Sequence, residues 1–215
     1  MERYLNADSV IAFISTDKAE LERLQTVVVK FGELARQSSP EDKKSNGGFG
    51  PAWLGRILNA HGLEADRCSC NGCIAPIHRH NKPCVIKHDD SEYVLAIKTN
   101  DEYTTETEVW DLILMFYPHT HYVYACENWG EQIYINTDTT GKYFPEKYMV
   151  EVYGTELEEV AIQYCKTEQE VLKFATSIYN VEFDSIEDIK KYMHDNKCFG
   201  GSCFLDIQEF KQEVE

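Results

Sequence analysis

The chain has 215 residues and a net charge of −16 at pH 7. That length is enough to bury a hydrophobic core without disulfide bonds. Residues 1–100 contain 13 acidic and 13 basic side chains, whereas residues 101–215 contain 24 acidic and 8 basic ones. A negative surface repels nucleic-acid phosphates and anionic membranes and attracts basic proteins, so this charge argues against direct binding to nucleic acid or to a membrane and is compatible with a basic protein partner. The alternative, which the exposed acidic helix positions favour, is that the acidic residues serve solubility alone.

The sequence contains no apolar run of about 18 residues, the length of a membrane-spanning helix, and no charged-then-apolar leader. We therefore expect a cytoplasmic protein. Its eight cysteines would stay reduced in that compartment, which favours metal binding or simple burial over disulfide bonds.

The first predicted element is a buried strand, the short apolar run at residues 10–14. Thr16 is the predicted N-cap of a helix that ends near Arg36, since apolar residues recur there at helical spacing after an acidic first turn. Residues 37–50 are polar and rich in Gly and Ser, which predicts a loop. A second helix is predicted over residues 51–62, which begin with Pro and end with Gly.

A short, turn-rich segment at residues 68–84 contains six potential metal ligands: Cys68, Cys70, Cys73, His78, His80 and Cys84. The pair Cys70 and Cys73 forms a C-x-x-C knuckle whose central Asn-Gly readily takes positive φ and turns both sulfur atoms toward one point. The two histidines are two residues apart, so both rings fall on one side of an extended segment. This spacing predicts a zinc site with two or three cysteines and one or two histidines, and it leaves open which four bind. The alternative is a loop of ordinary thiols and surface histidines.

After this loop the pattern changes to β structure. Residues 85–87 and 93–98 flank an Asp-Asp-Ser turn, which predicts a hairpin. A helix is predicted from about Thr105 to Pro118, because a Thr-Glu-Thr-Glu run supplies a cap and early acidic residues before apolar positions at helical spacing.

The second half of the chain has three predicted aromatic strands, at residues 121–127, 132–136 and 143–153. Short glycine-containing joins between them predict an antiparallel meander. Two further helices and a short strand are predicted at residues 167–179, 185–196 and 202–207.

Two stretches, SVIAFISTDKAELERLQTVVVKF and LAIKTNDEYTTETEVWDLILMFYPHTHYVYACENWGEQIYINTD, together carry a family resemblance. A strand at residues 95–99, an acidic joint at 102–105, a helix over 109–118 ending at Pro, and a strand closing on Glu-x-x-Gly at 127–130 follow in order. Over about residues 8–153 the chain resembles the YubB-type ferredoxin-like family of small plasmid and phage proteins. It lacks the Trp and two prolines usual at the joint in that family. The resemblance implies a ferredoxin-like fold and a mobile-element origin.

The order of elements predicts one α+β domain with the ferredoxin-like arrangement, an antiparallel sheet with helices mainly on one face. Residues 8–153 would form its body, including the Cys/His loop, and residues 154–215 a C-terminal helical extension.

No sequence signature of catalysis is present. G-x-S-x-G, H-E-x-x-H, P-loop and G-x-G-x-x-G motifs are all missing. Residues 83–84 begin a deaminase-like P-C-x-x-C, but Lys87 stands where the second cysteine should be. His119 and His121 could add ligands or line a groove, although histidines at such turns are more commonly surface residues.

Aromatic residues alternate along the predicted strands, with acidic residues among them, and we expect one face of these strands to pack under the helices. If the other face is open, the candidate partner-binding residues are Tyr122, Tyr124, Glu127, Trp129, Glu131 and Tyr134. Tyrosine and tryptophan dominate protein interfaces, whereas an RNA-binding sheet would need basic neighbours. The sequence thus favours a non-enzymatic acidic binding protein of phage or plasmid origin. It would dock, like an inhibitor, on a basic host protein such as a nucleic-acid-handling or defence complex. The alternative is a zinc-dependent enzyme with its metal at residues 68–84.

Overall fold

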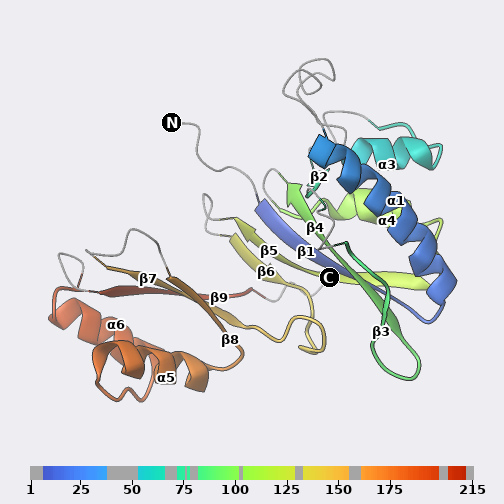
Figure 1. The fold of residues 1–215 in the computed structure, drawn as a ribbon. Coiled ribbons are helices and arrows are strands. Elements are labelled where there is room, and N and C mark those ends of the chain that lie inside the picture. Colours follow the sequence, from blue (N-terminus) through green and yellow to red (C-terminus); the bar gives the residue numbers. More distant parts are fainter. Residues whose placement is uncertain are drawn as a thin grey trace. The chain divides into compact units, whose positions relative to one another are not determined.

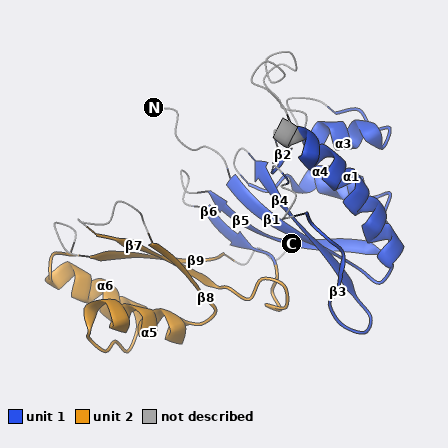
Figure 2. Ribbon diagram, in the orientation of Figure 1, with its two compact units in different colours: residues 1–137 blue, residues 138–215 orange. Residues whose placement is uncertain are grey.

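A computed structural model of the chain contains two compact units, residues 1–137 and 138–215, each with its own sheet and hydrophobic core (Figures 1 and 2). The sequence analysis expected one domain with an extension from residue 154, so the observed division falls earlier in the chain. Helices and antiparallel sheets are both present, which confirms the α+β class. The structure describes residues 7–37, 53–65, 72–75, 77, 82–101, 104–128, 133–154, 161–198 and 203–211.

The N-terminal unit is built on one antiparallel sheet with the strand order β2-β4-β1-β5-β6, and β3 pairs additionally with β4. Its strands are β1 (Ala7–Ser15), β2 (Cys73–Ile74), β3 (Ile86–Lys87), β4 (Tyr93–Asp101), β5 (Thr120–Asn128) and β6 (Ile133–Asn136). The central strand β1 pairs along nearly its whole length with both β4 and β5.

Three helices cover one face of this sheet, α1 (Lys18–Gln37), α3 (Leu54–Ala60) and α4 (Thr107–Leu114) (Figure 1). Side chains alternate between the faces of a strand, so Ile11 and Phe13 of β1 point to the helices. The ring of Phe13 packs edge-on against buried Trp110 of α4, with 5.1 Å between centroids. The predicted placement of helices on one face therefore holds for this unit.

The first helix begins at a different cap from the one predicted. Asp17 Oδ1 accepts a hydrogen bond from the backbone N–H of Ala19 at 2.9 Å, which makes Asp17 the N-cap. Thr16, the predicted cap, is exposed one position too early in the chain. Threonine and aspartate are both common N-cap residues, so residue type alone did not distinguish the two positions.

Strands β4 and β5 are both antiparallel to β1, so they run parallel to each other. Helix α4 connects them, and the three elements form one split β-α-β unit with β1 between its strands. A ferredoxin-like fold interleaves two such units, and that finer arrangement stays a prediction.

The C-terminal unit has a three-stranded sheet, β8-β7-β9, with α5 and α6 on one face (Figure 1). Its elements are β7 (Tyr148–Tyr153), β8 (Ala161–Cys165), α5 (Glu168–Tyr179), α6 (Ile186–Asp195) and β9 (Phe204–Glu209). Thr167 and Ser185 cap the two helices by accepting hydrogen bonds from backbone N–H groups. Val150 and Leu205 of the sheet pack with Ile189 of α6 in the core.

The predicted meander of three strands is wrong in its third member. β5 and β6 pair as expected, but β7 pairs with β8 and β9 in the other sheet. Of the loop predicted at residues 37–50, Gln37 is the last residue of α1, and the remaining residues lie outside the described ones. In the part of the chain that is described, no helix combines the length and the apolar character needed to cross a lipid bilayer.

Candidate functional site

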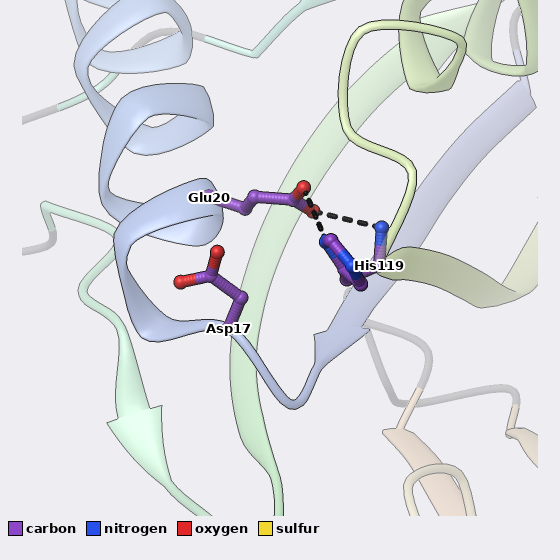
Figure 3. A group of neighbouring side chains, drawn as sticks. All are labelled: Asp17, Glu20 and His119. Atoms are coloured by element: carbon purple, nitrogen blue, oxygen red, sulfur yellow. Dashed lines mark hydrogen bonds and ion pairs between the residues drawn. The ribbon is translucent and has the colours of Figure 1, made fainter.

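A cluster of two carboxylates and one histidine lies where α1 begins and β5 starts (Figure 3). Asp17 is the N-cap of α1, Glu20 lies in the first turn of that helix, and His119 directly precedes β5. Potential ligand atoms of the three side chains lie within 4.8 Å of one another. Within the described ranges, no other group of three His, Cys, Asp or Glu side chains is close enough to share a metal ion.

Glu20 is the buried centre of this cluster. Its Oε2 accepts hydrogen bonds from the backbone N–H of His119 at 3.0 Å and from Thr120 Oγ1 at 2.9 Å, and its Oε1 lies 2.9 Å from His119 Nδ1. Burial by itself would raise the pKa of Glu20, but hydrogen bonds from His119 and Thr120 outweigh it and hold that pKa below its ordinary value. The carboxylate is therefore ionised at neutral pH.

This geometry permits two kinds of chemistry. An ionised Glu20 favours the tautomer with a proton on Nδ1 of the largely exposed His119 ring, an arrangement that can orient a histidine for proton transfer. With Nδ1 deprotonated, the same three side chains could ligate a divalent cation. Because both oxygens of Glu20 already accept hydrogen bonds, the cluster is also complete as a purely structural link between α1 and β5.

The predicted zinc loop is only partly described. Cys68, Cys70, His78 and His80 lie outside the described residues. Cys73 is partly buried and belongs to β2, where it pairs with Asn100, and Cys84 is exposed. Neither forms a group of three ligands with other described residues, so the zinc site stays a prediction.

A buried carboxyl group lies directly beside this loop. Asp101, at the end of β4, accepts a hydrogen bond on Oδ2 from Thr99 Oγ1 at 2.7 Å, and its Oδ1 has no hydrogen-bond partner among the described residues. Gly72 packs so closely that a Cβ there would lie 2.2 Å from Oδ1. Burial, opposed in part by hydrogen bonds from Thr99 and Ser9, raises the pKa of Asp101 to about 7.

The sequence analysis missed Asp101, although a signal for it exists. Leu95, Ile97 and Thr99 alternate toward the helices, and Asp101 is the next residue in that register. The predicted strand ended at residue 98, so Asp101 was not included in this alternation and its orientation toward the helices was not recognised.

The candidate partner-binding residues lie on both sides of the N-terminal sheet. Tyr122 packs beside Phe13 and donates to Asp111 Oδ1 at 2.9 Å, and Tyr124 is buried in the same core. Glu127 and buried Tyr134 pair across β5 and β6 on the opposite face. Trp129 and Glu131 lie outside the described residues. The described members therefore do not form one exposed surface.

Helix α4 instead exposes large apolar side chains. Leu112, near the end of the helix, is 42% exposed, and the two residues that follow the helix, Met115 and Phe116, are 74% and 44% exposed. Glu108 and Asp111 are exposed on the same helix. We call these five residues the α4 surface. The run Leu-Ile-Leu-Met-Phe at residues 112–116 was a signal for it, since a helix that buries one face cannot bury all of such a run.

Comparison with protein-family models, with curated proteins and with solved structures gave no match to this chain.

Proposed function

We propose that the protein is a non-enzymatic binding protein that docks on a basic protein through the α4 surface. The observation that carries this proposal is the exposure of Leu112, Met115 and Phe116 beside acidic residues. Contiguous exposed apolar side chains with a polar rim are typical of protein-interaction sites. Met is especially suited to such a surface because its flexible, polarizable side chain adapts to the partner.

Charge supports a basic partner. Residues 101–137, which include α4, contain seven acidic side chains and no lysine or arginine. A basic surface would be attracted to this segment before contact, and the apolar side chains would then be buried in the complex. A second copy of the chain is the less suitable occupant, because each copy carries a net charge of −16 and the two would repel each other.

The resemblance noted in the sequence supports a bacterial host as the source of the partner, since it points to a plasmid or phage protein. A host nucleic-acid-handling or defence protein has the required basic surface. Occupying that surface would compete with nucleic acid, which is how an acidic binding protein could act as an inhibitor.

The test compares three immobilised forms of the chain in a bacterial lysate: wild type, Met115→Lys and Leu34→Lys. Leu34 is also an exposed apolar residue on a helix of this unit, so its substitution is the matched control. We expect basic proteins that are retained by wild type and by Leu34→Lys and are lost with Met115→Lys. Identical retention by all three forms would contradict the proposal.

A zinc-dependent enzyme is the second candidate. The observation that favours it is the position of Asp101, whose Oδ1 lies next to Gly72, a residue of the C-x-x-C sequence. Asp101 could act as the acid or base that such an enzyme needs, and the sequence analysis had not identified a group for this role. Activity lost on chelation, with the fold retained, is the result that would support this candidate over the first.

A further inference from the structure

Both described helices of the C-terminal unit, α5 and α6, pack on the same face of its sheet, and the opposite face carries no helix among the described residues. Val150 and Val152 of β7 pack in the core with α5 and α6, so Glu151 between them points to the opposite face. In the neighbouring strands, Asp206 of β9 and Ile162 of β8 lie directly across from Glu151. Two carboxyl groups therefore stand side by side in the middle of this face.

Glu151 is 1% exposed, and only one of its two carboxyl oxygens accepts a hydrogen bond from a described residue. Its Oε2 accepts a hydrogen bond from the Tyr153 hydroxyl, whereas Oε1 is buried without a hydrogen-bond partner among the described residues. Asp206 Oδ1 accepts from Gln208 Nε2 at 2.8 Å, and neither carboxyl group forms an ion pair with a described residue. An unsatisfied buried oxygen is costly, and like charges directly across a strand pair repel. Burial and the charge of Asp206 accordingly raise the pKa of Glu151.

Apolar and aromatic side chains surround the two carboxyl groups. Tyr153, Ile162 and Tyr164 are all about 40% exposed, and they are among the most exposed large apolar residues of the unit. The Phe204 ring lies 6.0 Å from that of Tyr153. The face therefore combines negative charge at its centre with aromatic rings at its edge.

We propose that this face binds a lysine or arginine side chain of a basic partner. The cationic group would donate to Glu151 Oε1 and to Asp206, which satisfies the buried oxygen and separates the two carboxyl groups. Its methylene stem would cover Ile162, and its charge would lie near the tyrosine rings, which attract cations. Glu151 is 1% exposed, so binding requires the groups that cover it to move when the cation enters.

A metal ion is the less suitable occupant. Two carboxyl groups provide too few ligands for a dedicated divalent site, and the one metal-sized cluster in the described residues lies in the N-terminal unit.

The proposal rests on the proposed function in one respect, the basic nature of the partner. It concerns different residues, in the C-terminal unit, from those of the α4 surface.

The test measures binding of a synthetic peptide of alternating lysine and valine to the full chain by fluorescence anisotropy at low salt. A matched peptide with every lysine acetylated keeps the length and removes the charge. Wild type is compared with Glu151→Gln and Asp206→Asn, and with Glu182→Gln as control. Glu182 is an exposed carboxylate of the same unit, so its substitution changes the net charge equally.

We expect Kd for the lysine peptide to rise about tenfold in Glu151→Gln and Asp206→Asn, the usual effect of losing a hydrogen bond to a charged group, and less than about twofold in Glu182→Gln. The acetylated peptide should bind wild type no better than it binds Glu151→Gln. Equal weakening in all three variants would overturn the site and leave the α4 proposal standing. No binding of the lysine peptide to wild type would also overturn it, whereas the α4 proposal fails only in its own Met115→Lys comparison.

Discussion

Glu20 and His119 are 99 residues apart in the chain, and two hydrogen bonds join them, one to the backbone N–H of His119 and one to its ring. The hydroxyl group of Thr120 donates a third hydrogen bond to the Glu20 carboxylate. These contacts tie the start of α1 to the start of β5, next to the central strand β1. We therefore expect the stability of the N-terminal unit to depend on Glu20.

Replacing Glu20 with Gln should lower the free energy of unfolding by about 2–4 kcal/mol, because it removes hydrogen bonds to a buried charge and leaves donors unpaired. Chemical denaturation measures this loss. The control is Glu22→Gln, since Glu22 forms a solvent-exposed ion pair with Lys18 at 2.7 Å, and exposed pairs contribute little to stability. Equal effects of the two substitutions would contradict the role assigned to Glu20.

The Glu20 effect should also depend on pH. Its pKa is lower in the folded chain than in the unfolded chain, so its stabilisation is present above the unfolded pKa, near 4.5, and is lost as pH falls through the folded pKa. The stability difference between wild type and Glu20→Gln should therefore shrink in acid. A difference that stays constant from neutral to acid pH would show that the carboxylate charge is not involved.

Asp101 should give the opposite pH dependence. Its folded pKa of about 7 lies above the ordinary 3.8, so the folded chain keeps a proton that the unfolded chain releases. Stability should fall as pH rises from about 4 to about 7, by at most about 1.4 kcal/mol per pH unit, and level off above that.

The variant Asp101→Asn cannot ionise, so its stability relative to wild type should increase over the same pH range. Denaturation curves of both proteins at several pH values measure the difference. If the relative stability does not change between pH 4 and pH 7, Asp101 is not protonated in the folded chain.

Much of the secondary structure follows from the sequence, because alternation and helix caps are local signals. Thr167 and Ser185 cap helices α5 and α6 at the positions where the two helices were predicted to begin. The pairing partners of β7 could not be predicted, because the alternation of apolar and polar residues indicates a strand but does not indicate which sheet the strand belongs to.

The candidate sites were harder to predict for the same reason. Glu20 occurs in a sequence context that only suggests a favourable charge at a helix N-terminus, and its contact with His119 depends on how β1, α1 and β5 fold together. Glu151 lies in an apolar-acidic alternation whose orientation is fixed only once α5 and α6 cover Val150 and Val152.

The zinc prediction can be tested independently of the fold. Protein purified without chelator should contain about one zinc per chain, and Cys73→Ser should lower both the zinc content and the melting temperature, since a structural zinc contributes folding free energy. Cys203→Ser changes a partly buried cysteine of the other unit and should leave the zinc content unchanged. Metal-free protein of equal stability would mean that these cysteines are ordinary thiols.

The central claim is that the α4 surface binds a basic protein, and the most direct measurement is the association rate constant of a purified retained partner at low and at high salt. For wild type we expect a steep fall with salt, because the attraction is screened over about 8–10 Å. The variant Glu108→Lys should associate more slowly at low salt and converge on wild type at high salt, while Met115→Ser should mainly speed dissociation. An association rate that is independent of salt and unchanged by Glu108→Lys would contradict the claim.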